Sequence, residues 1–136
     1  MRLGVDLVSI PRFARVAGHP SACRMVFTPA ELEYADTLGA PRRMELLASR
    51  FCAKEAVAKV LGRGFGQGLV WRDIEVIRDA RGAPLIELAG GAWEIAAERG
   101  IERIDLSLSH QQDLVVCVAV AIEKESGVGD ADQRYR

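Results

Sequence analysis

Alternation of apolar and polar positions predicts several short strands. In residues 3–8, three aliphatic side chains alternate with Gly4, Asp6 and Val8, and a period of two is typical of a strand. Asp6 is then expected on the face opposite the aliphatic residues. Nearer the C-terminus, strand-like segments flank two turns, which predicts two hairpins, formed by residues 73–78 with 85–88 and by residues 104–109 with 114–123.

Helical signals fill much of the remaining chain. Ser9-Ile10-Pro11 predicts a helix start with a serine cap, and Thr28-Pro29-Ala30-Glu31 is a capping box for a helix that Gly39 stops. Further helices are expected over residues 44–61 and 92–98. Because helices come early and antiparallel hairpins late, the pattern predicts a single α+β domain over residues 1–123, an antiparallel sheet with packed helices. Residues 124–136 lack apolar clusters, so a disordered tail is expected there.

The long helix over residues 44–61 places a carboxylate on the face that should pack. Its apolar stripe consists of Met44, Leu47, Ala48, Phe51 and Cys52. At about 100° per residue the same stripe continues onto Glu55 and Lys59, while Arg50 and Lys54 fall together on one flank. A buried charge needs a partner or a metal. The alternative is an i,i+4 pair between Glu55 and Lys59, worth only a few tenths of a kcal/mol.

Composition and charge narrow the function classes. The 136 residues are 49% hydrophobic and carry a net charge of −1, so the chain as a whole has no field that would recruit nucleic acid. Residues 1–27 and 42–63 are locally basic, which suits an anionic partner or a solvated charged face. The three scattered cysteines support neither a zinc site nor disulfides. Asp6 interrupts any signal-peptide run and the apolar segment 114–122 is too short to span a membrane, so a cytoplasmic protein is expected.

Three placements suggest a metal and a phosphate ligand. Asp6 stands on a strand, Glu55 lies inside an apolar stripe, and His110 follows Ser107 and Ser109 at the turn of the last hairpin. Hard oxygen ligands favour Mg²⁺, which substrate phosphates usually complete. The alternatives are a solvent-facing strand residue for Asp6 and a hairpin histidine without function.

A glycine cluster follows the long helix, at Gly62, Gly64 and Gly66. Because it follows a helix and not a strand, it fits neither a dinucleotide fingerprint nor a P-loop. Gly62 is expected to stop the helix, and backbone amides near Gly62 and Gly64 remain candidates for contact with a phosphate.

Four segments occur in an order and spacing that resemble the 4′-phosphopantetheinyl transferases, specifically their short holo-acyl-carrier-protein synthase group. They are G-V-D-L-V-S-I (4–10), F-T-P-A-E-L (27–32), R-F-C-A-K-E-A-V-A-K (50–59) and L-S-L-S-H (106–110), the last followed by an aliphatic strand that ends at Glu123. Any one of the four alone would be a weak signal. Together they cover residues 3–123.

The resemblance implies a transfer of 4′-phosphopantetheine from coenzyme A to a serine of an acyl carrier protein, with release of 3′,5′-ADP. Asp6 and Glu55 would hold Mg²⁺, for which Mn²⁺ can substitute, against the coenzyme A diphosphate. Lys59 would contact the same diphosphate, and Glu55, directly or through a water, is the favoured proton acceptor. Arg50 and His110 would contact the 3′-phosphate end of the nucleotide from a neighbouring subunit.

The resemblance also implies partners. Short members of this group are homotrimers with sites between subunits, and this chain carries one copy of the motifs. Arg12 and Arg15 would meet the acidic carrier protein. The chain departs from the family pattern at Cys52, where alanine is usual, and at Val115 and Cys117, where small residues are frequent. Two other readings of the same residues are a non-catalytic module that keeps the fold and a magnesium-dependent nucleotide hydrolase that uses the acidic pair.

Overall fold

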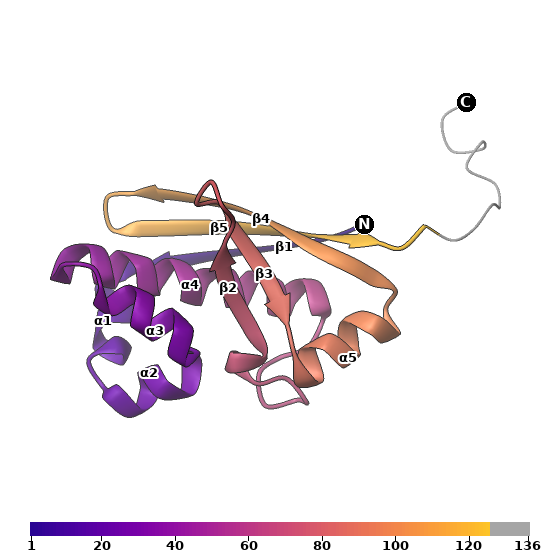
Figure 1. Cartoon of the computed structure of the whole chain (residues 1–136), viewed down its shortest axis with the longest axis horizontal. Helices are drawn as coiled ribbons and strands as arrows, with labels where there is room; N and C mark the ends of the chain where they lie inside the picture. The colour runs from indigo at the N-terminus through magenta and orange to yellow at the C-terminus, as the bar shows by residue number, and fades with distance from the viewer. Residues whose placement is uncertain (126–136) are drawn as a thin grey trace.

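The two ends of the described chain pair in one antiparallel sheet. Strand β1 (Arg2–Ser9) pairs with β5 (Leu114–Glu123), and β5 pairs with β4 (Ile101–Gln111), which gives the order β1-β5-β4. In the computed structural model, which describes residues 1–125, this sheet lies along α4 (Ala40–Leu61) (Figure 1). The antiparallel sheet with packed helices confirms the predicted α+β class.

Helix α4 is the central element and is buried on nearly all sides from Leu46 to Leu61. Strand β1 approaches α4 backbone to backbone, because a Cβ added at Gly4 would lie 2.2 Å from the Ala56 carbonyl oxygen. Gly62 ends the helix with a φ of 71°, as predicted. The helix begins four residues earlier than expected, since Gly39 is its N-cap. The prediction that Gly39 stops the preceding helix is therefore wrong.

Three short helices lie at the N-terminal end of α4, where the first and third pack against α4 and the second packs against the first and against the 3₁₀ turn Trp71–Asp73 (Figure 1). They are α1 (Ile10–Ala17), α2 (Pro20–Val26) and α3 (Pro29–Asp36). The capping box of α3 is confirmed: Thr28 Oγ1 accepts the Glu31 N–H at 3.2 Å and Glu31 Oε1 accepts the Thr28 N–H at 2.9 Å. Ser9 occupies the N-cap of α1, although its side chain makes no capping hydrogen bond. Helix α2 has no counterpart in the prediction, because its seven residues are too few to show a helical period.

The second sheet is the predicted hairpin of β2 (Ile74–Arg78) and β3 (Pro84–Leu88), preceded by the 3₁₀ turn η1 (Trp71–Asp73). Helix α5 (Gly90–Glu98) connects this hairpin to β4. Of the predicted tail, Lys124 and Glu125 are in neither helix nor strand, and the Lys124 N–H donates to the Gly100 carbonyl at 2.8 Å. Residues 126–136 lie outside the described residues. No helix within residues 1–125 is long and apolar enough to cross a membrane.

The aliphatic face of β1 is exposed, although aliphatic residues usually mark the buried face of a strand. Asp6 does lie opposite the three aliphatic residues, as predicted, but it shares the inner face with Gly4 and Val8 and points toward α4. The exposed outer face carries Leu3, Val5 and Leu7 on β1 and Leu114 and Val118 on β5. The sheet therefore turns an apolar face to solvent.

Candidate active site

Contact between β1 and α4 brings Asp6, Glu55 and Lys59 together. Lys59 Nζ donates to the Val5 carbonyl at 2.8 Å and to Asp6 Oδ1 at 3.1 Å. The Asp6 side chain is 16% exposed and that of Lys59 is 53% exposed, so the ion pair lies at the mouth of the helix–strand contact. Lys59 thus pairs with Asp6 across the contact, and no ion pair with Glu55 is found within residues 1–125.

Glu55 is half-buried beside this pair. Burial raises its pKa, the neighbouring Asp6 carboxylate raises it further, and Lys59 lowers it. Two carboxylates therefore lie near a single ammonium, which pairs with Asp6, and this leaves negative charge that a cation would neutralise. No cluster of three or more His, Cys, Asp or Glu is found in the described part of the chain. Two hard oxygen donors still fit Mg²⁺, which binds proteins through one or two carboxylates and completes its octahedron with water and phosphate oxygens.

An open cavity of about 500 Å³ adjoins Glu55 and Lys59. Its lining consists of Glu55, Ala58, Lys59, Gly62, Arg63, Gly64, Phe65 and Trp71. The Gly62 N–H already donates to the Ala58 and Lys59 carbonyls, and the Gly64 N–H donates to Gln67 Oε1. Both predicted glycines therefore border the cavity, but in this conformation their amides are bonded within the chain.

An aromatic wall on this cavity was missed by sequence reasoning. The Phe65 and Trp71 rings stack with centroids 3.6 Å apart and an interplanar angle of 10°, and Trp71 stacks in turn on Phe51 at 5.0 Å. The sequence held one signal for this wall: the aromatic residues Phe65 and Trp71 lie on either side of Gly66 and Gly68.

Arg50 lies on a different face of α4, with a side chain only 6% exposed. It lines a second cavity of about 270 Å³ together with Tyr34, Glu75 and Arg78. Burial lowers the pKa of Arg50, and the charge of Arg78 lowers it further. Arg78, which the sequence did not single out, holds its guanidinium 4.7 Å from the centre of the Tyr34 ring. Within one chain, Arg50 and Glu55 therefore face separate cavities.

His110 lies at the exposed end of β4, one residue before the strand ends. Its Nε2 is 2.7 Å from the Gln112 carbonyl oxygen. His110 on β4 pairs with Val115 of β5, and Asp6 on β1 pairs with Cys117 of β5. Strand β5 therefore lies between the histidine and the Asp6 carboxylate. One chain alone does not bring His110 into the Glu55 cavity.

Arg12 and Arg15 are exposed on α1, which begins directly after the strand that carries Asp6. Arg12 borders a shallow groove with Ser9 and the exposed Val16. The surface at the start of α1 is therefore basic with an apolar component.

The three departures from the family pattern lie in the core between α4 and β5. Cys52 Sγ donates to the Asp6 carbonyl at 3.3 Å and contacts the Val115 carbonyl at 3.6 Å. Burial, followed by the Asp6 charge, raises the pKa of Cys52 and of Cys117 to about 12. Neither thiol nor Val115 lines the cavities described above, so these residues repack the core beneath Asp6.

Comparison with known proteins places the chain in a family. Residues 2–119 match the family model of the 4′-phosphopantetheinyl transferase superfamily. The chain belongs to this superfamily. The resemblance predicted from the four sequence motifs is thereby confirmed.

Relatives within the superfamily match nearly the whole chain. A holo-(acyl-carrier-protein) synthase of Geotalea daltonii is 42% identical over 119 residues, which cover 86% of this chain and 94% of the relative. The crystal structure of the Neisseria meningitidis synthase has a TM-score of 0.81 at 33% identity and covers 90% of this chain and 98% of its own. A Bacillus anthracis synthase in complex with CoA (3′,5′-ADP) has a TM-score of 0.76 at 28% identity, with coverages of 90% and 96%.

Proposed function

We propose that this chain transfers 4′-phosphopantetheine from coenzyme A to a serine hydroxyl of an acyl carrier protein and releases 3′,5′-ADP, with Mg²⁺ as cofactor. The observation that carries the proposal is that Asp6 pairs with Lys59 beside Glu55, at an open cavity that Glu55 and Lys59 line. Family membership supports it, because the relatives described above are synthases of this kind and one of them holds CoA (3′,5′-ADP).

Asp6, Glu55 and Lys59 have different roles in the proposed transfer. Asp6 and Glu55 would hold Mg²⁺, for which Mn²⁺ can substitute, and when bound it supplies positive charge that offsets the charge developing on the diphosphate. Lys59 holds a diphosphate oxygen and is already turned toward Asp6. The serine oxygen bonds to the β-phosphorus as the bond from that phosphorus to the bridging oxygen breaks, and 3′,5′-ADP leaves. Glu55 accepts the serine proton, directly or through a water.

We assign the 3′-phosphate end of the nucleotide to the Arg50 side of the second cavity, away from the Glu75 carboxylate that also lines it. Within residues 1–125 Arg50 has no ion-pair partner, and Arg78 adds a second positive charge, so a phosphate would relieve the repulsion between the two guanidinium groups. Because Arg50 and His110 lie apart from the Glu55 cavity of the same chain, we assign their contacts to a nucleotide bound between subunits. Gly62 and Gly64 border the diphosphate end of that site.

A homotrimer would supply these shared sites. The outer face of the β1-β5-β4 sheet supports such an assembly, since Leu3 and Leu7 are 64% and 63% exposed and Val5 is 55% exposed. A contiguous apolar face of this kind marks an interaction surface. The basic face of α1 suits the acidic carrier protein, with Arg12 and Arg15 as its charges. We assign the reaction to the cytoplasm, and neither nucleic acid nor membrane takes part.

Intact mass spectrometry of the carrier tests the proposal. The protein is incubated with coenzyme A, Mg²⁺ and an apo-carrier, and the expected result is a gain of one phosphopantetheine on the carrier. Breakdown of coenzyme A without that gain would indicate the hydrolase, and neither change would indicate a non-catalytic module. Asp6→Ala and Glu55→Ala should abolish the gain, whereas the matched control Glu98→Ala, exposed on α5, should retain it.

A further inference from the structure

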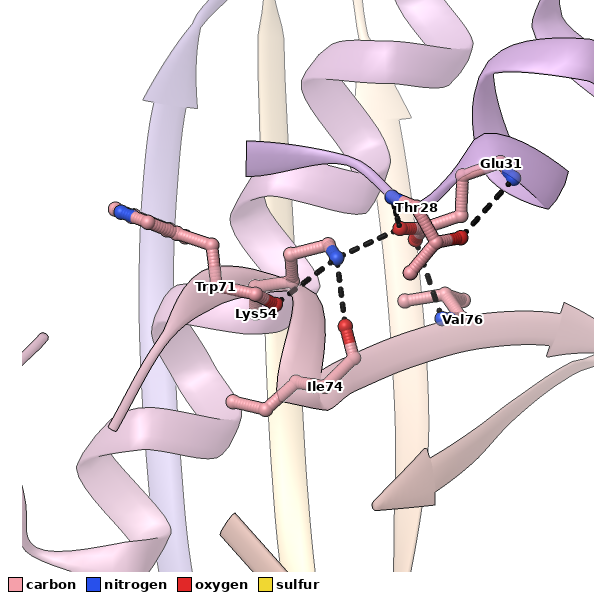
Figure 2. A network of polar contacts seen from close by, with 6 residues as sticks. All are labelled: Thr28, Glu31, Lys54, Trp71, Ile74 and Val76. Atoms are coloured by element: carbon pink, nitrogen blue, oxygen red, sulfur yellow. Dashed lines mark hydrogen bonds and ion pairs between the residues drawn. The ribbon is translucent and has the colours of Figure 1, made fainter. Parts of the chain in front are cut away.

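A fully buried lysine stands next to Glu55 in the sequence but points to a different side of α4. Lys54 is 0% exposed, and its ammonium donates three hydrogen bonds, to Glu31 Oε1 at 2.7 Å, to the Ile74 carbonyl at 2.6 Å and to the Trp71 carbonyl at 3.2 Å. Figure 2 shows these bonds converging on one nitrogen. All three protons of the ammonium are therefore committed.

The partner carboxylate is equally committed. Glu31 Oε1 also accepts the Thr28 N–H, and Oε2 accepts the Val76 N–H at 3.2 Å (Figure 2). The network thus ties the start of α3, the middle of α4 and the segment from Trp71 to Val76. A buried ion pair is weak grounds for stability, because apolar residues of similar volume often stabilise a protein as well or better. A role beyond stability is therefore worth testing for this pair.

The segment that Lys54 holds carries one wall of the Glu55 cavity. Lys54 binds the backbone at Trp71 and at Ile74, the residue that follows η1. The Trp71 ring in turn stacks on Phe65, and both rings line the cavity beside Lys59. The buried Lys54 ammonium is therefore connected to the cavity through Trp71, whose carbonyl accepts its hydrogen bond and whose ring lines the cavity.

We propose that Lys54 is a positioning residue for the transfer reaction, which holds the Trp71–Phe65 wall at a fixed distance from Glu55 and Lys59. This inference rests on the proposed function, because the wall borders the cavity assigned to the coenzyme A diphosphate. Lys54 itself touches neither substrate nor metal. Asp73 also ties η1 to the Ala89 and Gly91 N–H groups, but loss of the two Lys54 bonds releases the Trp71 end of η1, and the wall then shifts relative to Glu55 and Lys59.

The test uses the full chain in a Trp93→Phe background, so that Trp71 is the one tryptophan left to report. Trp93 is 60% exposed on α5 and lies outside the Glu55 cavity. Lys54→Met leaves Glu31 buried without its cation, so this single variant risks failing to fold. The double variant Glu31→Gln, Lys54→Met removes both charges and keeps an acceptor for the Thr28 N–H. Ile95→Ala, buried in α5, is the control for lost stability alone.

Three results are expected from the folded double variant. Trp71 emission shifts to the red and is more readily quenched by acrylamide. The value of kcat/KM for coenzyme A falls about tenfold or more beyond the fall in Ile95→Ala, since small displacements at a reacting centre are costly. The KM for the carrier does not change, because α1 is untouched. Phe65→Ala, which removes the outer ring and leaves the Lys54 network intact, reproduces the kinetic loss.

Wild-type emission together with wild-type kinetics in the double variant would overturn the inference, and so would wild-type kinetics in Phe65→Ala. If the double variant does not fold, the Phe65→Ala result decides whether the wall that Lys54 holds matters for the reaction, and wild-type kinetics there overturn the inference. The failure of the proposed function looks different: the wild-type protein would then leave the carrier mass unchanged, while the Trp71 emission would still report whether Lys54 fixes the wall.

Discussion

Replacement of Gly4 by alanine should move the site without touching any of its side chains. Gly4 has an ordinary strand conformation, so its backbone angles tolerate alanine. The space around Gly4 does not accommodate a methyl group, because a Cβ there would lie 2.2 Å from the Ala56 carbonyl oxygen and 2.9 Å from Val60 Cγ2. The oxygen belongs to the α4 backbone and cannot swing aside. Since ordinary contacts begin at 3.4 Å, strand and helix must separate by roughly 1.2 Å.

Two magnitudes follow from that separation. Overpacking of this kind costs about 1–3 kcal/mol, and a rigid backbone atom places Gly4→Ala toward the upper end. At roughly 4 °C per kcal/mol for a chain of this size, the melting temperature should fall by about 4–12 °C. Asp6 lies two residues along the displaced strand, so its distance from Glu55 changes as well. A displacement of about 1 Å can cost about 100-fold in rate, which is the expected loss of carrier modification.

Thermal unfolding and the carrier mass assay measure the two effects separately, the assay at a temperature where the variant is fully folded. Gly18→Ala is the matched control, because Gly18 has a φ of −69° and an added Cβ would meet nothing closer than 3.4 Å. That control should be as stable as the wild type or up to about 1 kcal/mol more stable. A Gly4→Ala protein with the melting temperature and transfer rate of the wild type would refute the backbone contact between β1 and α4.

Excess chelator should stop carrier modification, and added Mg²⁺ or Mn²⁺ should restore it; full activity in chelator would contradict the metal site. Inactive Glu55→Ala and His110→Ala chains should regain activity when mixed and allowed to exchange, whereas a stable, active monomer in light scattering would rule out shared sites. Arg12→Glu should raise KM for the carrier far more than KM for coenzyme A, and added salt should weaken carrier binding less in this variant than in the wild type; unchanged carrier kinetics in the Arg12→Glu, Arg15→Glu double variant would move the docking surface elsewhere. The buried Cys52 and Cys117, with pKa values of about 12, should react with a thiol reagent at pH 8 only after unfolding, and rapid labelling of the folded protein would contradict their burial.

Local signals predicted local structure well. The capping box at Thr28 and the helix stop at Gly62 are confirmed because each depends on residues a few positions apart. The bounds of β5 were predicted correctly from its aliphatic run, and the bounds of β4 were too short because its first and last residues alternate less regularly. The family was predicted from four ordered motifs, and the α+β class from early helices followed by late antiparallel hairpins.

Long-range choices were harder to predict. Alternation in β1 separates two faces but does not say which is buried, and the inner face is fixed by Gly4 meeting α4, which is more than fifty residues away. Helical geometry placed Lys54 on a flank of the long helix, and its partner Glu31 was predicted only in the capping box, so the sequence did not indicate that the two would meet. Arg78 joined Arg50 only through the packing of the β2–β3 hairpin against α3 and α4. Such pairs depend on tertiary packing, which helical period and propensity do not predict.

Water is a poor solvent for the outer face of the β1-β5-β4 sheet, where Leu3, Val5 and Leu7 stand exposed. If three chains cover that face, only assembled chains gain its burial, and by mass action the stability of each chain then rises with protein concentration. We expect the melting temperature to climb on concentrating the protein and to level off once assembly is complete. At high dilution the chains separate, and the folded fraction falls because the stabilisation from assembly is lost. The separated chains also expose this apolar face and the edge strand β1 to unrelated proteins.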